Sequence, residues 1–183
     1  MMGLSTPSAP PLTTVAWTDA VQEILGADTA QAFLAAPPAP WRDVLPALCT
    51  RYGLRSGLGI GVRLGRAFAR HMFPVLAVDE GLQTPDVRLL PWPRRMAVGV
   101  SRLADWAARE FQIAVQAKPW DEGFLWLATC PFGKVTAPEG IAACSPWVGL
   151  LEETLYWLSG GRWFAVAPHT HKDALFLPRH PLH

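Results

Sequence analysis

Apolar side chains recur every three or four residues through most of the first 111 positions, a spacing that predicts helices. The predicted helices cover residues 14–25, a short segment that begins at Asp28, residues 41–52, residues 55–73 and residues 94–111. Helix breakers separate them at Gly26, at the run APPAP (36–40) and at Gly53. Residues 74–93 are expected to be irregular.

After residue 112 the apolar period changes to two, which predicts β-strands. Ile113, Val115 and Ala117 alternate with small or polar residues, and a turn at 120–123 leads into a second strand at 124–129. These two segments predict a β-hairpin, followed by a loop from residue 130 to residue 144.

The chain after residue 144 predicts one more helix and a second hairpin. Ser145 is expected to be the N-cap of the helix and Pro146 its first residue, and Gly160 with Gly161 is a typical end. The positions expected to face the core of this helix are Val148, Leu151, Leu155 and Leu158. Segments at 162–167 and 173–177 then flank a turn. The order β-β-α-β-β in the C-terminal half predicts an α+β domain, in which an antiparallel four-stranded sheet packs against several helices.

The composition is that of one well-packed domain. Half of the 183 residues are hydrophobic, which is enough for a core without metals or disulfides. We expect a flexible Pro/Ser-rich tail at 1–12 and a single domain at 13–183. The 16 basic and 15 acidic side chains give a net charge of +1, so no nucleic-acid partner is expected.

The expected location is the cytoplasm. The first residues lack the basic and apolar regions of a signal peptide, and no apolar run is long enough to predict a membrane span. Three cysteines are too few and odd in number for a disulfide framework, which predicts reduced thiols.

Known catalytic and nucleotide-binding motifs are absent. The glycine run GLGIGVRLG at 57–65 does not have the G-x-G-x-x-G spacing, and no Walker, G-x-S-x-G or H-E-x-x-H pattern occurs. We therefore expect a protein that is not an enzyme. Gly57, Gly61 and Gly65 recur every four residues, which indicates either tight helix packing or the close approach of another chain or a ligand.

Four side chains are candidates for a metal site. Cys130 ends the second predicted strand and Cys144 precedes the next helix, so both are expected at one end of the sheet. The turn with His169 and His171 is expected to return to that end. Two thiolates and two imidazoles can hold a tetrahedral structural zinc. The alternative is that the histidines are solvated turn residues and the cysteines small core residues.

Large aromatic residues are the other candidate feature. Many of them lie on elements expected to face the space between the helices and the sheet, which suits either a plain core or a pocket for an aromatic or lipid-like ligand. The candidate ligand-binding residues are Phe68, Trp106, Phe111, Phe124, Trp126, Trp147 and Trp163.

Three stretches carry a resemblance to a known family. They are RSGLGIGVRLGRAF at 55–68, LWLATCPFG at 125–133 and CSPWVGLLEETLYWLSGGRWF at 144–164. From about Tyr52 to the C-terminus the chain resembles the 4-vinyl reductase domain, also called the hydrocarbon-binding domain. The last stretch is the most specific, because members carry a Cys, a helix like G-L-L-E and a Gly before a strand.

The resemblance implies an α+β fold related to TRAPP-complex subunits, usually dimeric, with a small-molecule pocket between helices and sheet. It implies a non-catalytic carrier or sensor of a hydrophobic molecule. Two alternatives stay open: an accessory or carrier protein in bacteriochlorophyll biosynthesis, at the vinyl reduction of the tetrapyrrole, and a dimeric scaffold. Many members bind zinc, and Cys144 matches the first zinc-binding cysteine. The later cysteines are missing here, where the chain reads HTHKDALFLP at 169–178.

Overall fold

The chain folds into seven helices and a four-stranded sheet within the residues that a computed structural model describes, namely 11–34, 39–138, 141–169 and 174–182. The helices are α1 (Leu12–Leu25), α2 (Ala27–Ala30), α3 (Val44–Tyr52), α4 (Leu54–Asp79), α5 (Pro85–Arg88), α6 (Trp92–Phe111) and α7 (Ser145–Ser159). The strands are β1 (Val115–Trp120), β2 (Gly123–Ala128), β3 (Ala167–Pro168) and β4 (Ala174–Pro178). This confirms the predicted α+β class and the order β-β-α-β-β.

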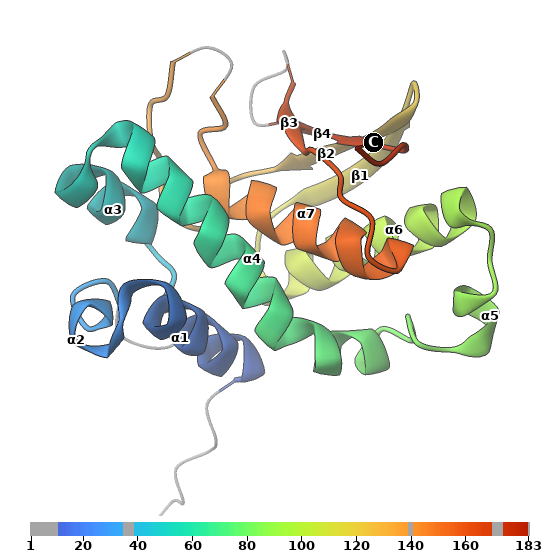
Figure 1. The fold of residues 1–183 in the computed structure, drawn as a ribbon, viewed down its shortest axis with the longest axis horizontal. Coiled ribbons are helices and arrows are strands. Elements are labelled where there is room, and N and C mark those ends of the chain that lie inside the picture. Colours follow the sequence, from blue (N-terminus) through green and yellow to red (C-terminus); the bar gives the residue numbers. More distant parts are fainter. Residues whose placement is uncertain (1–10, 35–38, 139–140, 170–173, 183) are drawn as a thin grey trace, which may run out of the picture.

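Helix α7 lies at the centre of the fold, between α4 and the sheet (Figure 1). Its predicted inward positions are all buried, and so are most of its other residues. Helix α4 packs along α7, while α1 and α3 pack on α4 and α6 packs on β1. The core is therefore formed where the long helices meet the inner face of the sheet.

The glycine stripe of α4 is used for packing inside the chain. A Cβ atom on Gly65 would lie 2.0 Å from the carbonyl oxygen of Pro146, and one on Gly149 of α7 would lie 1.9 Å from the carbonyl oxygen of Val62. Gly61 faces α7 in the same way, and Gly57 faces Cys49 of α3. Of the two explanations left open by the sequence, tight helix packing is the one observed.

Helix α4 is longer than the sequence pattern predicts, because it continues through Pro74 to Asp79. Proline lacks the N–H of the helical ladder and normally ends or kinks a helix. Here Leu76 and Ala77 are buried beyond the proline, and this packing outweighs the lost hydrogen bond. The prediction of irregular structure at 74–93 is therefore wrong for the end of α4, for α5 and for the first turn of α6.

The sheet has the strand order β1-β2-β4-β3, and every neighbouring pair is antiparallel. The predicted strand at 162–167 is wrong except at its end, since β3 has only two residues. Other partners take its backbone groups. The N–H of Val166 donates to Oε1 of Glu152 at 3.3 Å, and the carbonyl of Trp163 accepts from the N–H of Leu182 at 2.8 Å.

Several helix starts also differ from the sequence prediction. Helix α1 begins at Leu12, inside the predicted tail, and α3 begins at Val44, three residues after its predicted start. Ser145 is the first residue of α7 instead of its N-cap, and its buried hydroxyl has no hydrogen-bond partner among the described residues. None of the helices in the described part of the chain is both long and apolar enough to cross a membrane.

Candidate functional site

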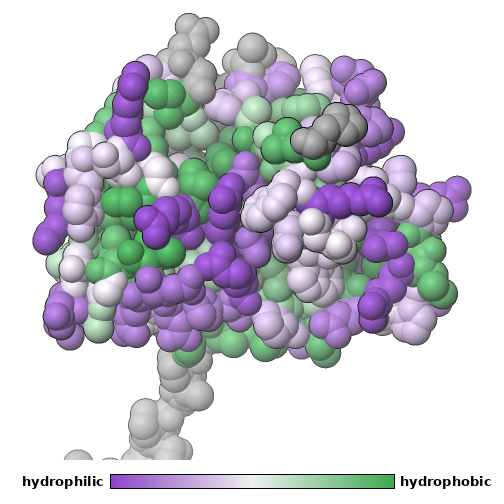
Figure 2. Space-filling view, in the orientation of Figure 1, coloured by the Kyte–Doolittle hydropathy of each residue, from purple (hydrophilic) through white to green (hydrophobic). Residues whose placement is uncertain are grey.

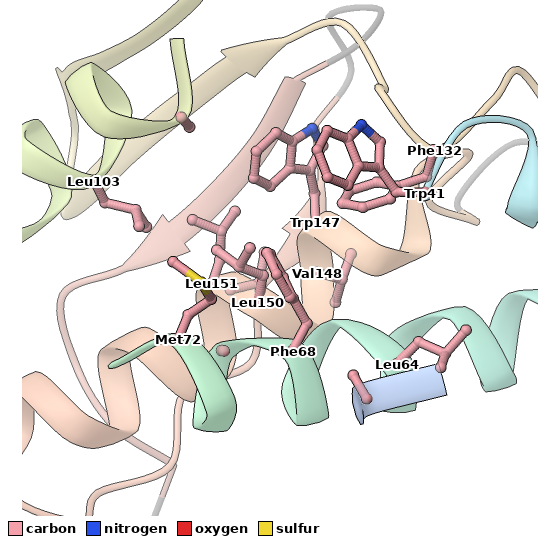
Figure 3. Packing of buried hydrophobic residues seen from close by; sticks show 14 of the residues in the cluster. Trp41, Leu64, Phe68, Met72, Leu103, Phe132, Trp147, Val148, Leu150 and Leu151 are labelled. Atoms are coloured by element: carbon pink, nitrogen blue, oxygen red, sulfur yellow. The ribbon is translucent and has the colours of Figure 1, made fainter. Parts of the chain in front are cut away.

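Eight large aromatic side chains form one continuous cluster in the core, which we call the aromatic cluster. Its members are Trp17, Trp41, Phe68, Trp106, Phe111, Trp126, Phe132 and Trp147. Phe111 is the hub, since its ring contacts those of five other members at centroid distances of 5.3–6.4 Å. Figure 3 shows Phe68 of α4 below a group formed by Trp41, Phe132 and Trp147.

The cluster joins segments that are far apart in the sequence. Trp17 comes from α1, Phe68 from α4 and Trp126 from β2. Phe132 comes from the loop after β2, where its ring stacks on that of Trp17 at 5.0 Å. Its carbonyl oxygen also accepts a hydrogen bond of 3.0 Å from the N–H of Leu45 in α3.

Five of the seven predicted ligand-binding residues belong to this cluster. Phe124 is also buried, two residues before Trp126 on the same face of β2. Trp163 lies apart from the cluster and is 46% exposed. Its ring packs against Tyr156, and the guanidinium of Arg66 lies over it at 5.4 Å. The structure thus places six of the seven in one core and the seventh at the surface.

Three members of the cluster were not among the residues predicted from the sequence: Trp17, Trp41 and Phe132. A signal existed for Trp17, which precedes Val21 by four residues and Ile24 by seven, the spacing of one helix face. Trp41 has the same spacing to two leucines of the helix predicted at 41–52, so a signal existed there too. No comparable signal existed for Phe132, because it lies in a loop without a period.

Two indole groups in the cluster have no hydrogen-bond partner within the described part of the chain. The Nε1–H groups of Trp17 and Trp126 are buried, and no described residue accepts from them. By contrast, the indole of Trp147 donates to the carbonyl oxygen of Thr129 at 3.4 Å. A buried donor without an acceptor costs roughly 1–3 kcal/mol, and native proteins rarely leave such groups unpaired.

A narrow apolar crevice adjoins the cluster between α4, α6 and α7. Phe68 and Trp106 belong to both the crevice and the cluster, and the remaining lining is also apolar, including Met72 and Leu103. The walls approach too closely to admit a water molecule. Pockets for small organic ligands usually enclose about 300–1,000 Å³, so a ligand needs some of these side chains to move.

Cys130 and Cys144 come together as predicted, with their Cα atoms 5.5 Å apart, but they form a disulfide. The expectation that all three thiols are reduced is therefore wrong for this pair, and only Cys49 carries a free thiol. The sequence offered no sign of the bond, since one pair among three cysteines is not a framework. The disulfide joins the end of β2 to the start of α7.

The four predicted zinc ligands are not assembled in this state. The sulfurs of a disulfide are not thiolates and cannot bind zinc. The ring of His169 packs edge-on against that of Trp120 at 5.5 Å, and His171 lies outside the described residues. No group of three metal-binding side chains occurs in the parts of the chain that the structure covers. Zinc stays a prediction, and it applies only to the reduced chain.

Ion pairs join α4 to α7 and to α1. Arg66 donates to Oε2 of Glu152 at 2.5 Å, and Arg70 pairs with Glu23 of α1 at 2.6 Å. Burial raises the pKa of the Glu153 carboxyl, an effect that Arg70 and Arg66 partly offset. The face in Figure 2 shows hydrophilic side chains crossing its middle, with hydrophobic areas beside them.

Comparisons with protein-family profiles, with curated proteins and with solved structures found no match. The 4-vinyl reductase resemblance therefore stays a prediction, as do the tetrapyrrole role and the homodimer that it implies.

Proposed function

We propose that this protein binds a small hydrophobic or aromatic molecule in the aromatic cluster, as a non-catalytic carrier or sensor. The observation that carries the proposal is the pair of buried indole N–H groups of Trp17 and Trp126, which have no acceptor among the described residues. A ligand with a carbonyl or ether oxygen supplies the missing acceptor, and its apolar body replaces aromatic contacts.

The crevice between α4, α6 and α7 supports the same proposal. It places an apolar surface next to Phe68 and Trp106, which are members of the cluster. Side chains that part along this crevice give a ligand a direct route to the cluster. The proposal therefore requires a closed protein that opens to bind.

A scaffold without a ligand is the second candidate. The observation that favours it is the close packing of the crevice walls, which leaves no room for a water molecule between them. In this case the aromatic side chains serve only to hold the helices on the sheet, and the unpaired indoles are a tolerated cost.

Thermal unfolding with a panel of apolar probes separates the two candidates. The panel includes 2-acetylnaphthalene and 2-ethylnaphthalene, which have similar size but differ in the carbonyl acceptor. A ligand that binds only the folded protein raises the Tm in a concentration-dependent way and quenches tryptophan fluorescence. We expect both probes to do so and the carbonyl compound to bind more tightly. No shift with any probe contradicts the carrier proposal and favours the scaffold.

Tryptophan-to-phenylalanine variants test the role of the unpaired donors. Trp126→Phe keeps a ring but removes the N–H, so the preference for the carbonyl probe is expected to fall by roughly 2- to 12-fold, the equivalent of one hydrogen bond. Trp92→Phe is the matched control, because the indole of Trp92 already donates to the carbonyl of Arg179 at 2.8 Å. An equal loss in both variants contradicts the assignment.

A further inference from the structure

The Cys130–Cys144 disulfide flanks the loop that carries Phe132 into the aromatic cluster. Cys130 lies two residues before Phe132, and Cys144 lies three residues before Trp147. The rings of Phe132 and Trp147 contact each other at 5.7 Å. The bond thus links the backbone just before Phe132 to the backbone just before Trp147, whose rings are in contact in the core.

We propose that this disulfide is a thiol–disulfide exchange site that controls a second entrance to the aromatic cluster, apart from the crevice between α4, α6 and α7. When it is reduced, residues 131–138, which we call the Phe132 segment, are released from the cluster and open a way in. The proposal rests on the proposed function, because it assigns the regulation of the same site.

Few polar contacts hold the Phe132 segment once the bond is broken. Among the described residues, two backbone hydrogen bonds link this segment to the rest of the chain: the N–H of Leu45 in α3 donates to the Phe132 carbonyl at 3.0 Å, and the N–H of Ile141, later in the same loop, donates to the Pro138 carbonyl at 3.1 Å. Gly133 has φ +104° and packs closely against Pro46, so the backbone can turn at this position without a side-chain clash. The remaining contact is apolar and centres on the Phe132 ring. Apart from the backbone itself, the disulfide is therefore the main covalent restraint on the segment.

Both cysteines are within reach of a small reductant, because each is partly exposed. The step is the attack of a dithiol's thiolate on one sulfur, followed by release of both protein thiols and oxidation of the dithiol to its own disulfide. Two electrons and two protons pass from the dithiol to the protein. In the cytoplasm predicted from the sequence, disulfides are usually transient and redox-sensing, which agrees with a bond that opens.

The loss of Phe132 uncovers the indole of Trp17. Phe132 stacks on that indole at an interplanar angle of 25°, and the other described aromatic contact of Trp17 is with Phe68. The reduced protein thus exposes one of the two unpaired N–H donors to an incoming ligand. In the oxidised protein the same donor is covered.

Hydrogen exchange tests the release without any ligand. The oxidised and dithiol-reduced full chains are compared at neutral pH with a chelator present, so that zinc cannot bind the freed thiols. The amide of Leu45 is expected to exchange at least about ten-fold faster after reduction, because its acceptor on Phe132 has moved away. The amide of Phe68, in the middle of α4, reports global unfolding and is expected to keep its protection. A Cys130→Ser/Cys144→Ser double variant should match the reduced protein without any reductant.

Stopped-flow tryptophan quenching by 2-acetylnaphthalene then tests access. Faster binding to the reduced protein and to the double variant supports the proposal. Unchanged exchange at Leu45, an equal increase at Leu45 and Phe68, or the same binding rate in both redox states overturns it. Binding in neither state overturns the proposed function, and with it the access role, whereas the exchange at Leu45 still decides whether reduction releases the segment.

Discussion

At the residue scale, the glycines between α4 and α7 set how closely these helices pack. The four-residue repeat in the sequence predicted a close approach but could not decide its partner, because a glycine stripe looks the same whether it faces its own chain or another. In the structure, Gly61 and Gly65 pack against α7 of the same chain. The repeat therefore no longer supports a homodimer, which rests on the family resemblance alone.

Substitution of Gly65 is expected to destabilise the fold. In Gly65→Ala the new methyl group meets the backbone of Pro146 and Leu150, which cannot yield without moving α7. Such overpacking costs about 1–3 kcal/mol or more. Gly59→Ala on the same helix is the control, since no atom of another described segment lies within 4 Å of its Cβ position, and it is expected to gain up to about 1 kcal/mol from helix propensity. Urea unfolding of both variants checks this, and equal stabilities contradict the packing.

At the element scale, the sequence predicted the strands and helices that have a clear period and missed contacts between irregular segments. β1, β2, α6 and α7 were placed to within a few residues because their apolar positions repeat. Tertiary packing extends α4 through Pro74, although a proline at this position predicts the end of the helix. The Phe132 segment joined the core from a loop, where periodicity carries no information.

The buried carboxyl of Glu153 on α7 predicts a pH dependence. Burial raises the pKa of this group in the folded chain above its ordinary value of 4.5, with Arg70 and Arg66 acting in the opposite direction. The carboxyl then stays protonated up to a higher pH in the folded state than in the unfolded state. The stability contributed by the protonated form is therefore lost as the pH rises from the ordinary pKa through the raised one.

Glu153→Gln removes this ionisation and tests the direction in which stability changes with pH. We expect the variant to gain stability relative to the natural chain as the pH rises above 4.5, and to differ least at lower pH, where both side chains are neutral. Tm values from pH 4 to pH 8 give the comparison. If the variant instead loses stability relative to the natural chain over this range, the attraction between Arg70 and the ionised Glu153 carboxylate outweighs the cost of burying that charge.

At the scale of the whole molecule, the fold is an aromatic core closed between helices and sheet, with one disulfide at the point where the core meets an irregular loop. The homodimer expected from the resemblance has its own test. Light scattering at high micromolar concentration is expected to give twice the mass of the chain, and a monomer at that concentration contradicts the expectation.

The most direct test of the central claim is the behaviour of the indole N–H signals in a nitrogen-15 correlation spectrum titrated with 2-acetylnaphthalene. The chain has nine tryptophans, and their indole signals are assigned with Trp→Phe variants. Saturable binding is expected to move the signals of Trp17 and Trp126, which gain an acceptor, and to leave that of Trp92 in place. If neither the Trp17 nor the Trp126 signal moves at saturating probe, or if Trp92 moves as much as they do, the aromatic cluster is not a ligand site.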